Sequence, residues 1–405
     1  MEKEFIKETQ HSITLNVTAG QIDSYRELEK TTGTVRVYEN GCIGVAGCLG
    51  EPDEEALTEQ AKEALSFGIP YPCNLEGAAE ITELHDGEII PIPEFIPFMK
   101  NFLERLGALC PKMAFSNKIR LVHGKTEYRN SQGRHLLSSG SHLSIELLGQ
   151  NRGSGNLLDM VFAWQGEDFD PEMVLAEFKR QYDMFYTPAD IEPGCWPVVA
   201  IPQDLLGTCL QHFIGDLYAA GASLLSGKLG EKVFSEKLTF CDDMNPCTSF
   251  ETCFFDAEGC TAKDYRPVLV ENGVLKGLLT TKKTAGQYGL QNLGTANAPY
   301  DGVPDLGFHG CYLAKTAETL KELVPGKAVF MMIASGGDMT PDGHFATPVQ
   351  LAFLLEDGKL AGRLPEISIS GNFFDMLGKD YIGTTYDWPF KKVQLAAVTM
   401  DVKKN

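Results

Sequence analysis

The best candidates for metal chemistry are a cysteine and a histidine three residues apart. Cys209 and His212 lie in the apolar stretch 203–226, and residues at this spacing can meet on one face of a helix. A hydrolytic zinc needs three protein ligands and one open position for water. No third or fourth ligand is evident nearby. A buried thiol beside a histidine is therefore the favoured interpretation, and a Cys209–His212 metal site is the weaker alternative.

Four more cysteines follow this stretch and could be considered as further zinc ligands. They are Cys241, Cys247, Cys253 and Cys260. Their spacings lack the C-x-x-C pair that is typical of structural zinc sites, so we expect separate thiols in the core or in loops. The chain holds 11 cysteines spread singly over 405 residues. This usage favours reduced thiols over a disulfide scaffold, and with them a cytoplasmic location.

One acidic cluster offers oxygen ligands for a divalent cation. It consists of Asp242, Asp243 and Asn245. Neighbouring carboxylates in a polar loop are usually solvated and bind no ion. The sequence therefore predicts that these side chains are exposed to water.

A glycine-rich segment near the C-terminal end could contact a peptide. Glycines in a strand region often let another backbone approach closely, as when a peptide adds itself to a sheet as an extra strand. Asp338 and His344 could form a polar pair beside that peptide. The candidate substrate-binding residues are Gly336, Gly337, Asp338 and His344. The alternative is that these glycines serve only as turns and bulges.

Local signals place several of the surrounding elements. Asn40-Gly41, Asn272-Gly273 and Asp357-Gly358 are strong hairpin signals, because such pairs supply the positive φ of a two-residue turn. Asp53 and Asp170 are the expected first caps of two helices, the second with proline at its first helical position. Further helices are expected from about residue 94 and near 317–323.

The apolar stretch 203–226 is predicted to form one long helix. Its large apolar residues recur at spacings of three and four, which is the period of a buried helical face. A loop rich in proline and glycine, 187–197, is the candidate domain boundary. The sequence predicts an α+β fold with a mixed N-terminal domain, 1–190. A second domain, 195–405, is expected to be dominated by antiparallel sheet and to contain the long helix.

Composition excludes several classes of function. A net charge of −20 argues against prolonged contact with a phosphate backbone, so no nucleic acid is expected as a partner. No stretch approaches the ~20 consecutive apolar residues that a membrane helix requires. The opening segment, MEKEFIKETQHSITL, lacks the apolar core of a secretory signal.

The order and spacing of several motifs resemble the TldD/PmbA family, the so-called modulators of DNA gyrase. The motifs are YRNSQG at 128–133, GKLGEK at 227–232, ENGVLKG at 271–277 and ISISGNFFDMLGK at 367–379. The resemblance covers most of the chain and implies the two-domain fold of that family.

In the TldD branch of this family, a helix carries HExxxH, which is two zinc-binding histidines and a glutamate base. Counting back from the GKLG motif, those positions fall here on Leu206, Gly207 and Gln211. Leucine and glycine offer no ligand atom, and an amide is a poor substitute for imidazole. The cysteine that TldD-type chains carry near their C terminus is also missing. The chain is therefore similar to the PmbA (TldE) type.

The resemblance implies a non-metal subunit of a cytoplasmic peptidase that acts on unfolded peptides. The expected partners are a TldD-type subunit, or a second copy of this chain in a dimer, and a peptide substrate. No cofactor is expected in this chain, because the zinc would lie only in the TldD-type partner. Two alternatives stay open: an autonomous metallopeptidase with a non-standard metal site, and a non-catalytic protein that binds peptides as a scaffold.

Overall fold

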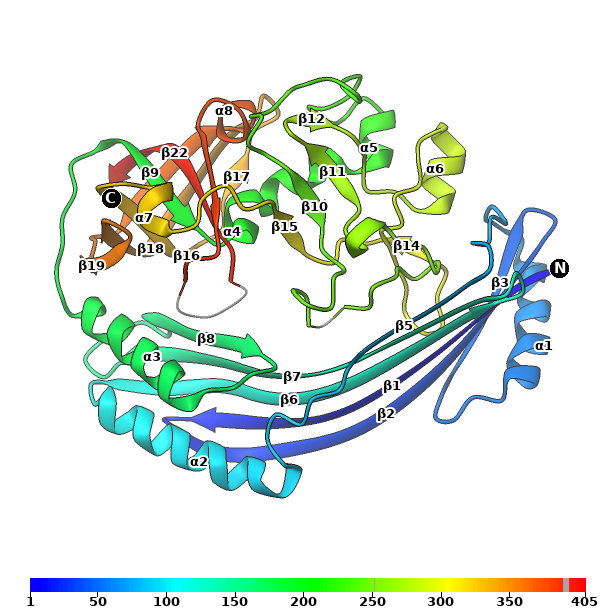
Figure 1. The fold of residues 1–405 in the computed structure, drawn as a ribbon, viewed down its shortest axis with the longest axis horizontal. Helices are drawn as coiled ribbons and strands as arrows, with labels where there is room; N and C mark the ends of the chain where they lie inside the picture. The colour runs from blue at the N-terminus through cyan, green and yellow to red at the C-terminus, as the bar shows by residue number, and fades with distance from the viewer. Residues whose placement is uncertain (251, 389–392) are drawn as a thin grey trace.

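A long curved sheet forms the N-terminal part of the molecule (Figure 1). The computed structural model describes residues 1–250, 252–388 and 393–405. The strand order is β4-β3-β2-β1-β6-β7-β5, and β8 also pairs with β7. All pairs are antiparallel except β5–β7, which is parallel. The strands are β1 (Glu2–Thr18), β2 (Gln21–Glu39), β3 (Cys42–Leu49), β4 (Ile69–Pro70), β5 (Ala79–His85), β6 (Met113–Asn130), β7 (Arg134–Asn151) and β8 (Met160–Gly166).

Helices cover the convex face of this sheet. They are α1 (Glu54–Ala64), the short 3-10 helix η1 (Leu65–Phe67), α2 (Ile92–Leu109) and α3 (Pro171–Phe185). The two expected caps are confirmed, because the side chains of Asp53 and Asp170 each accept two backbone N–H groups of the following turn. Ile13 and Leu15 of β1 are buried in one core with Phe95 of α2 and Phe178 of α3. Because the helices cover this apolar face, the opposite, concave face of the sheet is the one that can remain polar.

The C-terminal part contains a second large sheet, smaller sheets and short helices. Its main path is β16-β9-β22-β20-β18-β17, and a further pairing of β16 with β18 closes a ring of strands. β19 also pairs with β18, and β21 with β22. The strands of this sheet are β9 (Gly194–Ala200), β16 (Lys327–Ala334), β17 (Asp338–Met339), β18 (His344–Glu356), β19 (Lys359–Arg363), β20 (Ile367–Asn372), β21 (Tyr381–Thr385) and β22 (Leu395–Lys404).

The smaller elements lie between β9 and β16 and after β20. One small sheet has the order β12-β11-β10-β15, and β13 pairs with β14. The strands are β10 (Phe240–Asp242), β11 (Val268–Glu271), β12 (Val274–Leu275), β13 (Ala296–Asn297), β14 (Asp305–Leu306) and β15 (Cys311–Leu313). The helices are η3 (Lys263–Tyr265), α6 (Lys282–Tyr288), α7 (Leu320–Leu323) and α8 (Phe373–Leu377). The expected α+β fold with a C-terminal half rich in antiparallel sheet is therefore confirmed.

The hairpin signals are confirmed by the backbone. Asn40 and Gly41 have φ of 52° and 75°, and they connect β2 to β3. The pairs at 272–273 and 357–358 likewise have positive φ at both residues and connect β11 to β12 and β18 to β19. Both central residues of a type I′ turn need this conformation, which Asn, Asp and Gly tolerate best.

The prediction of one long helix over 203–226 is wrong. The structure has α4 (Pro202–Leu206), the 3-10 helix η2 (Gly207–Phe213) and α5 (Gly215–Ala219), and the chain is extended at Ile214, with φ −72° and ψ 124°. The break lets the N–H of Gly215 donate to the carbonyl of Leu279 at 2.9 Å. Periodicity reports which residues are buried, but it does not detect this contact with a segment far away in the sequence.

The apolar core crosses the expected domain boundary. One buried cluster includes Val174 of α3, Val199 of β9 and Phe330 of β16. Because the core is shared across this point, the boundary between two domains at 190–195 remains a prediction. In the part of the chain that the structure describes, no helix combines the length and the apolar character needed to cross a membrane.

Substituting Gly215 tests whether the break in the helix is required. A Cβ at Gly215 would lie 2.8 Å from Cγ2 of Thr280, so Gly215→Ala should lower the free energy of unfolding by about 1–3 kcal/mol. Gly207→Ala is the matched control, because its Cβ would meet only Nε2 of Gln203 at 3.5 Å and its φ of −54° is helical. Urea unfolding should show the control to be neutral or more stable. If both variants raised the free energy of unfolding equally, Gly215 would lie within a continuous helix, and the break would be contradicted.

Candidate functional site

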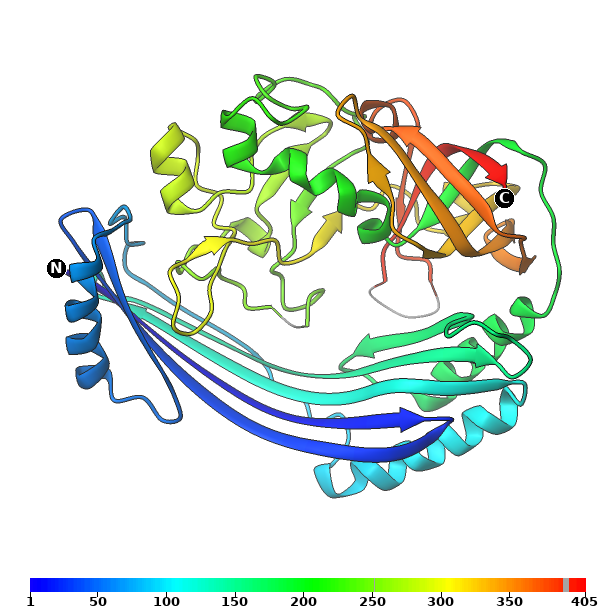
Figure 2. The same ribbon diagram turned by 180° about the vertical axis from the view of Figure 1, so that it is seen from behind.

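A cavity of about 870 Å³ lies between the concave face of the curved sheet and the loops of the C-terminal part. Its floor is formed by β1, β2, β6 and β7, whose curvature is visible from both sides in Figures 1 and 2. Its opposite wall is formed mainly by residues from 246–250, 252–257, 296–300 and 308–309. The size is within the ~300–1,000 Å³ that is common for ligand sites.

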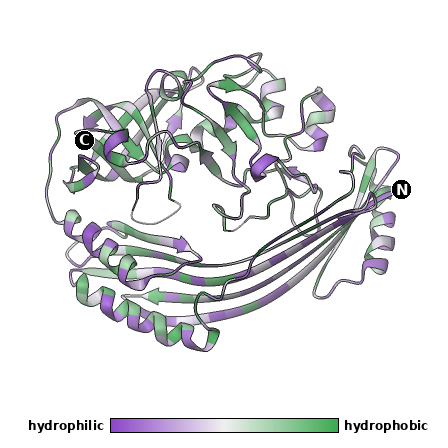
Figure 3. Ribbon diagram, viewed as in Figure 1, coloured by the Kyte–Doolittle hydropathy of each residue, from purple (hydrophilic) through white to green (hydrophobic). Residues whose placement is uncertain are grey.

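Hydroxyl-bearing and charged side chains make up the floor. In one row across the sheet, Glu8 of β1 is paired with Thr32 of β2 and Thr126 of β6, and Thr126 is paired with Ser138 of β7. All four residues line the cavity. Further along β1, alternate residues such as Ile13 and Leu15 are buried against the helices, and Figure 3 shows bands of hydrophilic and hydrophobic colour along the strands. The cavity is consequently a polar site that can hydrogen-bond a ligand.

A buried aspartate–histidine pair forms part of the cavity wall. Asp242 is fully buried, and its Oδ2 lies 2.7 Å from Nδ1 of His309, which lines the cavity. The other oxygen of Asp242 accepts the N–H groups of His309 and Gly310. Burial lowers the pKa of His309, but the hydrogen bond and charge of Asp242 outweigh it, so the pKa lies above its usual value. His309 therefore favours the cationic form at the wall.

The prediction that the acidic cluster at 242–245 is solvated is wrong. Asp242 is engaged by His309, and Asp243 is buried with its Oδ1 2.9 Å from Nε of Arg266. The side chain of Asn245 bonds the backbone of Asp264 and Cys247. Both carboxylates gain partners that are distant in sequence. Composition alone therefore does not reveal their burial.

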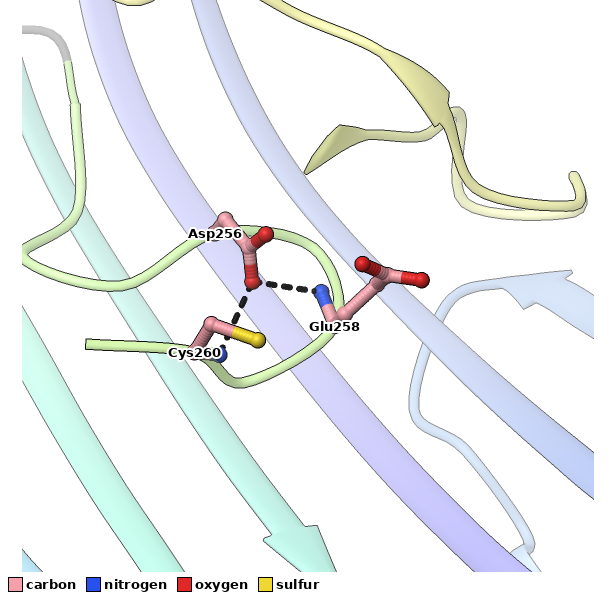
Figure 4. Close-up of side chains that lie close together, drawn as sticks. All are labelled: Asp256, Glu258 and Cys260. Carbon is pink, nitrogen blue, oxygen red and sulfur yellow. Dashed lines mark hydrogen bonds between the residues drawn. The ribbon is translucent and has the colours of Figure 1, made fainter. Parts of the chain in front are cut away.

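Asp256, Glu258 and Cys260 form a second cluster, in one tight loop (Figure 4). A ligand atom of each lies within 4.8 Å of the others, and no other group of three or more such residues occurs in the described ranges 1–250, 252–388 and 393–405. Carboxylates and a thiolate are ligand types that zinc accepts. The sequence-based interpretation grouped Cys260 with other cysteines and not with the two acidic residues just before it. The pattern D-x-E-x-C at 256–260 was the signal that could have revealed this cluster.

Hydrogen bonds already occupy the ligand atoms of this cluster. Asp256 Oδ1 accepts the N–H groups of Glu258 and Cys260, at 2.9 and 2.8 Å, and its Oδ2 accepts the N–H of Ala296 at 3.0 Å. Glu258 accepts the hydroxyl of Tyr71 and, at 3.0 Å, the N–H of Lys282.

The ammonium group of Lys282 supplies the positive charge that an ion would otherwise bring. Its Nζ donates to the carbonyl of Glu258 at 3.2 Å and lies 3.8 Å from Oε1 of Glu76. Sγ of Cys260 lies 3.5 Å from the same oxygen, and burial raises the pKa of this thiol, which favours its protonated form. The residues present therefore do not fit a zinc ion.

The same loop connects the two parts of the molecule. Glu4 of β1 is 1% exposed and accepts the hydroxyls of Tyr38 and Tyr128, each at 2.9 Å. Tyr128 also lies 3.3 Å from the carbonyl of Glu258, and Arg36 donates to the carbonyl of Ala257. A continuous buried network thus runs from the curved sheet to the wall of the cavity.

The positions that correspond to HExxxH do not form a site. Leu206 is buried in the apolar core, whereas Gln211 is exposed and its amide donates to the carbonyl of Thr208. Gly207 has no side chain. None of the three lines the cavity.

The weaker metal alternative is not favoured by the geometry. Cys209 is in the apolar core, and burial raises the pKa of its thiol to about 12. Nδ1 of His212 accepts the N–H of Leu224 at 3.3 Å, so the proton of the neutral ring is on Nε2. Within the described residues that protonated nitrogen has no hydrogen-bond partner, and the ring packs edge-on against Phe373. A nitrogen that carries a proton offers no lone pair to a metal.

The glycine-rich residues lie at the far edge of the second sheet. Asp338 belongs to the short β17, which pairs with β18, and Gly336 and Gly337 precede it. His344 is exposed and lies 3.7 Å from Asp342, not beside Asp338. None of these residues lines the cavity. Their contact with peptide stays a prediction.

Comparisons with known proteins agree with the fold and the motifs. Residues 199–401, half of the chain, match the model of the PmbA/TldA metallopeptidase C-terminal domain. A protein of Archaeoglobus fulgidus named "Metalloprotease" is 25% identical over 390 residues, 92% of this chain and 89% of that protein. One of Methanothermobacter thermautotrophicus with the same name is 33% identical over 202 residues, 48% of this chain and 44% of that protein. The matched part therefore spans under half the length of that relative.

Two solved structures share the whole fold. TldE from Thermococcus kodakarensis superposes with a TM-score of 0.81 at 19% identity, covering 100% of this chain and 97% of that one. A protein of Thermotoga maritima described as a modulator of a DNA gyrase gives a TM-score of 0.77 at 20% identity, covering 99% and 96%. These structures confirm the expected fold, and the match over residues 199–401 confirms the family resemblance that the motifs predicted.

Removing the titration of Glu258 should change how stability depends on pH. Burial, and next the charge of Asp256, raise the pKa of Glu258 to about 7, above its ordinary value of 4.5. A raised carboxyl pKa gives stability that is present below 4.5 and is lost as the pH rises through 7. Glu258→Gln should therefore flatten the fall in unfolding free energy between these values by on the order of 1–3 kcal/mol. Urea unfolding across pH 4.5–8 measures it.

Glu236→Gln is the matched control for this substitution, because the side chain of Glu236 is 78% exposed. Its pH profile should follow that of the unmodified chain. A Glu258→Gln profile that is parallel to the control would show that Glu258 is ionised throughout, and would contradict the raised pKa.

Proposed function

Because this chain belongs to the PmbA/TldD metallopeptidase family, we propose that it is the subunit without the hydrolytic metal in a peptidase of that family. It binds unfolded peptide in its cavity and presents it to a partner subunit that carries the zinc. The partner is a TldD-type chain with HExxxH. The chain itself splits no amide bond.

One observation carries this proposal: a large polar cavity without an available metal-ligand set. The cavity of about 870 Å³ is lined by hydroxyls, carboxylates and cations. Within the described residues, the only cluster of three ligand types near it is engaged by backbone N–H groups and Lys282. Hydrolysis by a zinc enzyme needs an open coordination position and a base beside the water. Among the described residues of this wall, no free set of ligand atoms is available for them, which supports a binding role.

The remaining chemistry suits binding and orientation. Thr32, Thr126 and Ser138 can donate and accept hydrogen bonds, so they can contact peptide groups of different sequence. His309 is held by Asp242 and presents positive charge at the wall. Holding a substrate in a fixed orientation lowers the entropic cost of the reaction at a separate catalytic group. These residues therefore have a defined role without a metal in this chain.

Metal analysis and reconstitution test the proposal together. The purified chain should contain zinc far below one ion per chain by mass spectrometry and should not cleave a labelled unfolded polypeptide. Adding a TldD-type partner from the same cell should produce cleavage, and changing the glutamate of the partner's HExxxH should abolish it, because that residue is the base. His212→Ala in this chain is the matched control and should leave cleavage by the pair unchanged.

Two other results would lead to the alternative functions. Stoichiometric zinc in the lone chain, lost in the Cys209→Ala and His212→Ala variants, would establish an autonomous metal site and overturn the proposal. Peptide binding by the lone chain without cleavage in the presence of any HExxxH partner would establish a scaffold.

A further inference from the structure

The outer strand of the curved sheet has a long free edge. β2 pairs with β1 from Gln21 to Tyr38, but β3 pairs with it only from Thr32 to Glu39. Within the described residues, no strand covers the outer edge over 21–31. Most of its residues are exposed, and Tyr25 is 60% exposed. Figures 1 and 2 show β2 as the outermost of the long strands.

The two faces of the segment 21–31 carry charged residues of opposite sign. Glu27 lies on the helix-covered face, because it is paired with Ile13 and its Oε1 lies 2.8 Å from Nε2 of His11. Glu29 is two residues further and shares that face. Arg26 and Lys30 point to the opposite face, on which Lys30 lines the cavity. The edge is therefore acidic on its convex side and basic on the side of the cavity.

Arg120 of β6 adds to the positive charge on the concave face. Thr14 of β1 is paired with Arg26 on one side and with Arg120 on the other, so the three side chains share one face. Arg120 also lines the cavity. Among the described residues, no ion pair joins Arg26, Lys30 or Arg120 to a carboxylate. These cations are unusual in a chain of net charge −20, because carboxylates outnumber them elsewhere.

We propose that the free edge of β2 binds an extended acidic segment of the peptide substrate, whose carboxylates face Arg26 and Lys30. The segment adds to the sheet as a further strand, so main-chain hydrogen bonds provide affinity and alternate side chains provide selectivity. This inference rests on the proposed peptide-binding function and specifies its substrate class. Opposite charges across neighbouring strands stabilise the pairing, whereas like charges oppose it.

A second copy of this chain is a poor occupant of the same edge. Two identical antiparallel edges are related by a twofold axis perpendicular to the sheet, which brings each face beside the same face of its copy. Arg26 and Lys30 would then lie beside Arg26 and Lys30 of the copy, and Glu27 beside Glu27 or Glu29. Like charges in neighbouring strands are destabilising. Charged edge strands commonly prevent such self-association. Here the positive residues share one face of β2, so a strand with carboxylates on that face can still pair with it.

Peptides that differ only in charge test the proposal on the full-length chain. Three ten-residue peptides with one label alternate threonine with glutamate, glutamine or lysine, and binding is followed by fluorescence anisotropy. The glutamate peptide should bind most tightly and the lysine peptide most weakly. Raising the salt concentration should reduce the difference, because exposed charges are screened. N-methylation of alternate residues on one side of the glutamate peptide should abolish binding, since strand addition needs those N–H groups.

Substitutions at the edge identify the site. Arg26→Gln and Lys30→Gln should each weaken binding of the glutamate peptide by about two- to fivefold, and should leave the glutamine peptide unaffected. The controls are Lys276→Gln and Lys327→Gln, each of which removes one charge from an exposed position outside the cavity. Unchanged thermal unfolding of all variants should show that they fold normally.

The outcomes separate this inference from the proposed function. Equal or tighter binding of the lysine peptide would overturn the acidic preference while the peptide-binding function stands. Effects of Arg26→Gln and Lys30→Gln no larger than those of the controls would place the peptide elsewhere and overturn the β2 edge as the site. If no peptide of any charge binds, the proposed function fails and this inference fails with it.

Discussion

The cavity depends on a buried polar network that joins the curved sheet to the loop 256–260. Glu4 accepts the hydroxyls of Tyr38 and Tyr128, and Tyr128 reaches the backbone of Glu258. Removing one partner from such a network leaves a buried polar group unsatisfied, which costs far more than a surface contact. At the other end of the cavity, the apolar core passes continuously from α3 to β16. The sheet is therefore fixed at both ends, and its concave face is left free between them.

The loop 256–260 illustrates why ligand types alone do not define a metal site. Asp256, Glu258 and Cys260 are chemically suited to zinc and lie close together. Their lone pairs, however, face backbone N–H groups, and a buried ammonium lies among them. The same residues that could hold an ion instead bond the sheet to the C-terminal part. Their role is structural, and the proposed peptide binding rests instead on the polar floor of the cavity.

Several elements could be predicted because their causes are local. The caps Asp53 and Asp170 act within one helical turn, and Asn40-Gly41 acts within two residues. The long helix over 203–226 was wrong because apolar periodicity does not include the bond between Gly215 and Leu279. Asp242 was expected in water, yet its partner His309 lies 67 residues away. Each error concerns a contact between distant segments.

The sequence by itself determined the family, the α+β class, the hairpins and the absence of HExxxH at 206–211, because these depend on residue types at short spacing. Strand alternation also separates Glu27 from Arg26 and Lys30 on any extended segment. Only the tertiary structure decided which of those faces lines a cavity, and which carboxylates acquire partners. The physical reason is that the curvature of the sheet and the burial of Asp242 and Glu258 arise from contacts between segments far apart in the chain.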